Sequence, residues 1–189
     1  MFEQLISRAN GRIEAHDNGT ITGYAIVYYN GSPGTEYQLG PDTFERIERG
    51  AAKNAIRDGI IATREHDNKL ILGRSPETLT LWEDEHGIGY TIKLDLDTTM
   101  GRDAYNLVRS KRLQGSSFKA YVTPSYSRDG NKNVKLVRAF KRLDEISIVA
   151  EPAYEGTTAV VRSIADECRR LEETESRILI ARKLLHVPT

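Results

Sequence analysis

The sequence has little cysteine, no net charge and no long apolar run. Its one cysteine, Cys168, excludes an internal disulfide and any Cys-x-x-Cys metal site. The 27 basic side chains equal the 27 acidic ones, so no overall field would gather nucleic acid or an anionic membrane. No stretch approaches the roughly 20 apolar residues of a membrane-spanning helix, and the first residues lack the apolar run of a signal peptide. We therefore expect a protein that stays in the cytoplasm.

The signatures of several enzyme classes are also missing. The chain contains no P-loop, no G-x-G-x-x-G, no H-E-x-x-H and no EF-hand loop. Asp95 and Asp97 alternate along a predicted strand and are a minor candidate for a cation site with His66 and Asp67, but no second histidine or defined spacing accompanies them. We expect neither a cofactor nor a bound metal.

Short apolar segments separated by turn signals make up most of the chain. Hydrophobic residues account for 39% and charged residues for 29% of the 189 residues, which suits one globular domain with or without a terminal appendage. A polar turn is predicted at residues 67–69 and a hairpin tip at 83–87. Runs of β-branched and aromatic residues predict strands over 19–29, 37–39, 59–65, 70–72, 79–82, 89–94, 115–123, 132–142 and 145–149.

Three segments have the apolar spacing of helices. They are residues 43–57, residues 99–110, and the stretch from Ser163 onward, where Ile164, Cys168, Leu171 and other apolar residues stand among paired Arg and Glu. Many short strands with few helices predict an α+β protein. We expect an antiparallel β-barrel core, closed or nearly closed, surrounded by helices, with a long C-terminal helix.

Two segments carry candidate groups for nucleophilic catalysis. Gly115-Ser116-Ser117-Phe118 places hydroxyls beside a small residue in a strand-like run, where a carbonyl carbon could approach closely. Paired serines beside glycine are also common in turns. His66 ends an apolar strand just before a turn, where its imidazole could project over the rim of a sheet and accept a proton at neutral pH.

Asp144 and Glu145 lie at the start of the strongly apolar strand predicted within residues 143–149. A carboxylate drawn into such a strand needs a compensating partner. His66 is one candidate partner, because a carboxylate that accepts Nδ1–H would fix the tautomer of the imidazole. The alternative is an ion pair between Glu145 and Arg138 or Arg142.

Taken in order, these segments resemble the prohead (capsid maturation) serine proteases of tailed bacteriophages, which are similar in fold to the herpesvirus assemblins. The resemblance runs from about Gly19 to Val161 and includes GSSF at 115–118, LDEISIV at 143–149 and EPAY at 151–154. It is also carried by residues 23–28, 39–44, 66–67, 72–74, 79–81 and 87–88. Family members often have Gly-Phe after the Ser-Phe pair, where this chain has Lys119-Ala120.

The resemblance implies a serine endopeptidase that cleaves a scaffold protein, or the scaffolding segment of the major capsid protein, during prohead maturation, and that also cleaves itself. It implies Ser117 as nucleophile in preference to Ser116, His66 as base and Glu145 as third member, with Asp144 and Glu151 as alternatives for the last role. It further implies a homodimer inside the immature capsid in the host cytoplasm, with a protease domain over residues 1–162 and a helix over 163–189 for packing, dimerisation or tethering.

Two other functions fit parts of the sequence. A non-catalytic capsid-assembly or scaffold module could keep the protease fold and bind partners through its C-terminal helix. A nucleic-acid-binding barrel could use the basic run from Lys132 to Arg142, but most such runs are solvated faces and the net charge is zero. We therefore expect no nucleic-acid partner and no membrane contact.

Overall fold

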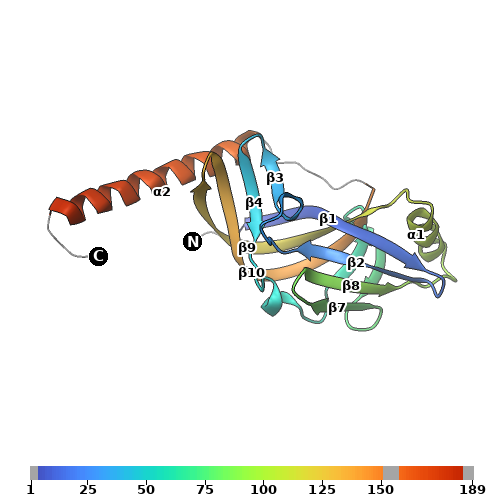
Figure 1. Cartoon of the computed structure of the whole chain (residues 1–189). Coiled ribbons are helices and arrows are strands. Elements are labelled where there is room, and N and C mark those ends of the chain that lie inside the picture. Colours follow the sequence, from blue (N-terminus) through green and yellow to red (C-terminus); the bar gives the residue numbers. More distant parts are fainter. Residues whose placement is uncertain (1–3, 151–157, 185–189) are drawn as a thin grey trace.

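The protein contains more strand than helix (Figure 1). The computed structural model describes residues 4–150 and 158–184. The strands are β1 (Gln4–His16), β2 (Thr20–Val27), β3 (Tyr37–Gly40), β4 (Thr43–Ile47), β5 (Ile61–Arg64), β6 (Asp67–Arg74), β7 (Leu79–Glu83), β8 (Gly87–Lys93), β9 (Gly115–Asp129) and β10 (Lys132–Val149). The helices are α1 (Thr99–Arg109) and α2 (Thr158–Leu184), with short 3-10 turns at Pro33–Thr35 and Lys53–Ala55.

The strands join in one sheet whose order is β3-β4-β10-β9-β1-β2-β8-β7. The long strand β10 pairs in parallel with β4 along its first half and with β5 along its second half, and β6 pairs with β5. No pairing between described strands joins β3 to β7. The mixed α+β class is confirmed, whereas closure of the sheet into a barrel stays a prediction.

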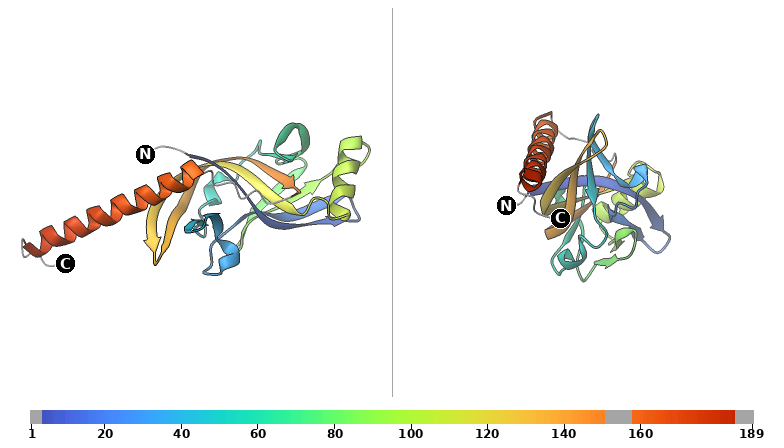
Figure 2. Two further views of the ribbon diagram at one scale, coloured as in Figure 1. Left: turned by 90° about the horizontal axis from the view of Figure 1, so that it is seen from above. Right: turned by 60° about the vertical axis from the view of Figure 1, so that its left-hand side comes forward.

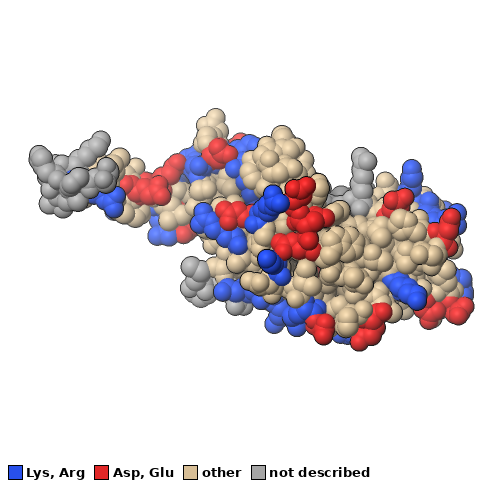
Figure 3. Space-filling model, turned by 60° about the horizontal axis from the view of Figure 1, so that its bottom comes forward, with Lys and Arg blue, Asp and Glu red and all other residues tan. Residues whose placement is uncertain are grey.

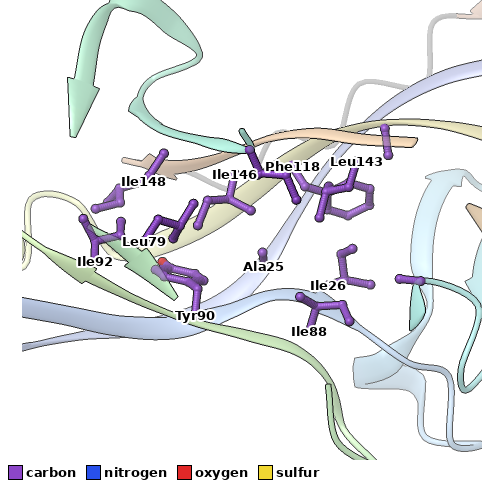
Figure 4. Close-up of a cluster of buried hydrophobic side chains, with 14 of the residues drawn as sticks. Ala25, Ile26, Leu79, Ile88, Tyr90, Ile92, Phe118, Leu143, Ile146 and Ile148 are labelled. Atoms are coloured by element: carbon purple, nitrogen blue, oxygen red, sulfur yellow. The ribbon is translucent and has the colours of Figure 1, made fainter. Parts of the chain in front are cut away.

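The core lies where the sheet folds over on itself. Side chains of β2 and β8 face those of β9 and β10 across it (Figure 4), and Ile26, Ile88, Phe118 and Ile146 are all at most 1% exposed. Successive side chains of a strand point to opposite faces. Because Phe118 and Ile146 point into the core, their neighbours Ser117 and Glu145 are directed to the other face.

One predicted helix is wrong. Residues 43–57 form β4 and a 3-10 turn, although Phe44, Ile47, Ala51 and Ala55 have helical spacing. The residues of β4 alternate between buried and half-buried, and they pair with β10 from Thr43 opposite Asn133 to Ile47 opposite Val137. Pairing with a distant strand therefore overrides the local periodicity.

Other elements differ from the predictions mainly in extent. Strand β1 was not predicted, and the two strands predicted within 132–149 form one continuous strand, β10. The turn predicted at 67–69 lies instead at Glu65 and His66, because Arg64 pairs with Asp67. The hairpin of β7 with β8 and the helix α1 are confirmed.

The predicted C-terminal helix is confirmed but begins before Ser163. Its first half covers β9 and β10, where Ile164 and Cys168 are buried with Leu39. Its second half projects away from the body (Figure 2), and residues 178–180, three consecutive aliphatic side chains, are 48–58% exposed. Leu185, His186 and the rest of 185–189 lie outside the described residues. Neither α1 nor the described length of α2 is apolar enough over a sufficient length to cross a membrane.

Candidate active site

His66 lies in the tight turn between β5 and β6. Glu65 and His66 have φ values of 54° and 57°, and the pairing of Arg64 with Asp67 makes them the two central residues of a hairpin. Such turns usually contain Asn-Gly, because a left-handed conformation costs other residues about 1–2 kcal/mol each. Both backbone amides of the turn donate hydrogen bonds to β10, from the Glu65 amide to the Ile148 carbonyl at 3.0 Å and from the His66 amide to Ser147 Oγ at 2.9 Å.

The imidazole of His66 bridges a serine and a glutamate. Its Nε2 lies 2.7 Å from Ser117 Oγ, and its Nδ1 lies 2.8 Å from Glu145 Oε1. Ser117 comes from β9 and Glu145 from β10, so three separate segments meet at one point. An ionised carboxylate can only accept a hydrogen bond, so Nδ1 carries the proton and Nε2 accepts from the serine hydroxyl.

Glu145 is held ionised by its neighbours. Its carboxylate accepts hydrogen bonds from Thr63 Oγ1 at 2.5 Å and His66 Nδ1, and it lies 3.1 Å from Lys119 Nζ. Burial alone would raise the pKa of Glu145, but the hydrogen bonds from His66, Thr63 and Lys119 outweigh it and hold the pKa at about 2. The group next to Nδ1 is therefore an anion at neutral pH.

Three supporting residues were not assigned to the site from the sequence. Ser147 supports the turn, Thr63 contacts both Glu145 and Ser147, and Lys119 also donates to the His66 carbonyl at 3.3 Å. Strand alternation could have indicated two of them, because Ser147 is two residues after Glu145 and Lys119 two after Ser117. In the sheet, Ser117 is opposite Ser147, and Lys119 is opposite Glu145.

The alternative candidates lie elsewhere. Ser116 is fully buried on the core side, with its hydroxyl 2.7 Å from that of Tyr90. Asp144 is half-buried and forms ion pairs with Arg57 and Arg142. Glu151 lies outside the described residues.

The arginines considered as partners of Glu145 are engaged elsewhere. Arg142 pairs with Asp144 at 2.5 Å, and Arg138 lies 3.4 Å from Glu48. The described partners of the Glu145 carboxylate are instead His66, Thr63 and Lys119.

Comparison with known proteins gives the family. Residues 4–175 match the family of caudovirus prohead serine proteases. This chain belongs to that family. The match spans β1 to the middle of α2, so it includes all three residues of the Ser117–His66–Glu145 cluster.

One solved structure supports the fold assigned to this prohead protease family member. The bacteriophage T4 capsid assembly protease, gp21, superposes with a TM-score of 0.52 and 10% sequence identity, covering 78% of this chain and 98% of that one. At this identity the likeness shows the fold alone. No curated protein matches the sequence of this family member.

Lys119 is the site residue at which this family member departs from the Gly-Phe pattern noted above. Replacing it with Met keeps the length of the side chain but removes the charge beside Glu145 Oε2. We expect Lys119→Met to lower the free energy of unfolding at pH 7 by about 1 kcal/mol. The pKa of Glu145 should rise toward its ordinary value.

The pH dependence of that loss follows from the lowered pKa of Glu145. A carboxylate with a lowered pKa stabilises the folded state above its ordinary value of 4.5, and this stabilisation is lost as the pH falls toward about 2. The difference between wild type and Lys119→Met in urea unfolding should therefore shrink over that range. Lys141→Met, at an exposed position of β10, is the control. A difference that does not change with pH would contradict the assigned contact.

Proposed function

We propose that the chain is a serine endopeptidase in which Ser117 is the nucleophile, His66 the general base, and Glu145 the group that orients His66. The observation that carries this proposal is the unbroken series of hydrogen bonds from Ser117 Oγ through both imidazole nitrogens to Glu145. Nucleophile, base and orienting acid stand in the order that acyl transfer requires.

The reaction would proceed in two stages. Ser117 Oγ attacks the carbonyl carbon of the peptide bond as its proton passes to His66 Nε2, and the nearby Glu145 carboxylate stabilises the resulting imidazolium. The same proton then passes to the leaving amine as the C–N bond breaks, leaving an ester on Ser117. In the second stage a water molecule gives a proton to Nε2 and attacks the carbonyl carbon of this ester. Nε2 then returns that proton to Ser117 Oγ as the C–O bond breaks, and the product acid is released.

The family points to substrates inside the prohead. We infer that the chain cleaves a scaffold protein or the scaffolding segment of the major capsid protein, as well as itself, within an immature capsid in the host cytoplasm. We assign catalysis to residues 1–162, which contain the whole cluster. Residues 163–189 then serve for packing, dimerisation or tethering, and the exposed aliphatic side chains at 178–180 favour a role in a homodimer.

Labelling with a fluorophosphonate tests the proposal directly. Wild type should take up one equivalent of a biotinylated fluorophosphonate, and peptide mapping should place it on Ser117, because the hydroxyl of Ser117 lies 2.7 Å from His66 Nε2. His66→Gln should slow the labelling on the order of a hundredfold or more, because the imidazole of His66 activates Ser117 Oγ by accepting its proton. An adduct mapped to another residue would remove Ser117 from the mechanism. Folded wild type that takes up no label would favour a non-catalytic assembly module.

A further inference from the structure

Two buried hydroxyl groups, those of Thr63 and Ser147, connect the contacts that hold the main chain and the imidazole of His66. The His66 amide donates to Ser147 Oγ at 2.9 Å, and the ring Nδ1 lies 2.8 Å from Glu145 Oε1. Thr63 links these contacts, because its Oγ1 is 2.5 Å from Glu145 Oε1 and 3.1 Å from Ser147 Oγ. The contacts therefore close a ring that includes both parts of the proposed base.

The hydrogen bonds of this ring run in one direction. A backbone amide can only donate, and an ionised carboxylate can only accept. Thr63 has one hydroxyl proton, which the Glu145 carboxylate accepts. The proton of Ser147 is therefore directed at Thr63, whose Oγ1 and carbonyl oxygen are 3.1 Å and 3.3 Å away. Ser147 Oγ in turn accepts from the His66 amide. Rotation of either hydroxyl proton breaks a contact of the ring.

The ring lies inside the protein, away from competing water. On the face shown in Figure 3, basic and acidic side chains are interspersed at the surface, where exposed ion pairs contribute little. Thr63, Ser147 and Glu145 are by contrast at most 3% exposed. Hydrogen bonds are electrostatically stronger in such an interior, and linked ones polarise one another. We therefore expect the ring to keep a fixed geometry.

The ring is on the same face of the sheet as the proposed nucleophile. Thr63 on β5 is opposite Ser147 on β10, which is in turn opposite Ser117 on β9. Residues directly opposite each other on neighbouring strands direct their side chains to one face. The two hydroxyls are therefore beside Ser117 and not on the core side of the sheet.

The turn that carries the base needs this support. Glu65 and His66 both have left-handed backbone conformations, which persist only where the surrounding structure fixes them. The acceptor of the His66 amide, Ser147, is on β10, the strand that also carries Glu145. One strand thus supplies the contacts of both the main chain and the ring of His66.

We propose that Thr63 and Ser147 are positioning residues for catalysis. Their ring of hydrogen bonds holds the His66 imidazole at the 2.7 Å that separates Nε2 from Ser117 Oγ. This proposal rests on the proposed peptidase function. A displacement of about 1 Å can slow a reaction on the order of a hundredfold. Because both residues act through the base and its acid, their loss should lower kcat and leave KM nearly unchanged.

Thr63→Val and Thr63→Ser form the matched pair that tests the hydroxyl. Valine has nearly the shape of threonine but no hydroxyl, whereas serine keeps the hydroxyl and loses the methyl group. The substrate is a peptide that wild type cleaves, chosen from a chymotryptic peptide library. Thr63→Val should lower kcat on the order of 10- to 100-fold with KM within about twofold of wild type. Thr63→Ser should keep kcat within about threefold of wild type.

Ser147→Ala is the second variant, and Ser75→Ala is its control. The hydroxyl of Ser75 is also buried and accepts from a backbone amide, that of Ile60 at 3.1 Å, but Ile60 precedes β5 whereas His66 follows it. Both variants should lower the midpoint of urea unfolding by similar amounts. Only Ser147→Ala should lower kcat, on the order of 10- to 100-fold. A merely structural hydroxyl would not produce this difference.

The double variant Thr63→Val/Ser147→Ala tests whether the two hydroxyls act as one unit. Its loss of kcat should be little more than the larger single loss, because either substitution breaks the ring. Circular dichroism checks that each variant is folded. The proposal is overturned if folded Thr63→Val or folded Ser147→Ala cleaves at close to the wild-type rate, or if Thr63→Ser loses as much as Thr63→Val. An equal loss of kcat in Ser75→Ala would also overturn it.

Fluorophosphonate labelling of Ser117 separates failure of this proposal from failure of the proposed function. If wild type labels and cleaves while the Thr63 and Ser147 variants are unimpaired, only the positioning role is wrong. If wild type neither labels nor cleaves, the peptidase function is wrong, and the positioning role falls with it.

Discussion

Ser117→Ala should abolish processing of the capsid or scaffold protein when the two are co-expressed. With purified protein, kcat/KM should fall on the order of 10³- to 10⁶-fold, because alanine leaves the imidazole with no hydroxyl to activate. The substitution removes only the atom 2.7 Å from His66 Nε2. We therefore expect the circular dichroism spectrum and the midpoint of thermal unfolding to stay close to those of wild type.

Ser116→Ala is the control for that variant, since the two serines are neighbours on β9 but point to opposite faces. Ser116 contacts the Tyr90 hydroxyl in the core, so its loss should cost about 1–3 kcal/mol of stability and leave most of the activity. If Ser116→Ala lost processing while folded and Ser117→Ala kept it, the assignment of the nucleophile would be reversed.

Strand alternation explains why part of the site could be predicted from the sequence. Phe118 is apolar and belongs in the core, so its neighbour Ser117 faces outward and Ser116 inward with Phe118. The same reasoning applies to Glu145 beside Ile146. That His66 reaches both residues follows from pairing of β5 with β10 and from a left-handed turn at two non-glycine residues. No local pattern indicates such a turn.

The errors in the predicted fold come from long-range pairing. The segment of β4 has the apolar spacing of a helix but pairs with a part of β10 that follows about 90 residues later. Strand β1 is no richer in apolar residues than the chain as a whole, yet it lies between β9 and β2 in the sheet. In both cases the energy that selects a strand comes from a partner that is distant in the sequence.

Glu145→Gln should lower kcat on the order of 10²- to 10⁴-fold with little change in KM. The amide is nearly isosteric, so the hydrogen bond to Nδ1 can persist in altered form, but a neutral group cannot stabilise the imidazolium that forms during attack. The substitution also removes the anion that Lys119 contacts at 3.1 Å. Single-turnover cleavage of a peptide substrate, with KM measured in parallel, separates this loss from weaker binding.

The low pKa of Glu145 gives this prediction a pH signature. Because that pKa is about 2, the wild-type carboxylate is ionised at any pH near neutrality, and the ratio of wild-type to Glu145→Gln rates should be constant there. The stability that the carboxylate contributes should likewise be constant near pH 7 and should disappear only as the pH falls from about 4.5 toward about 2.

Asp144→Asn is the control, because it makes the same charge change one residue away. The side chain of Asp144 pairs with Arg57 and Arg142, so this variant should cleave the substrate at close to the wild-type rate. If Glu145→Gln retained near-normal activity while Asp144→Asn lost it, the contact between Nδ1 and Glu145 would be structural, and Asp144 would be the orienting acid.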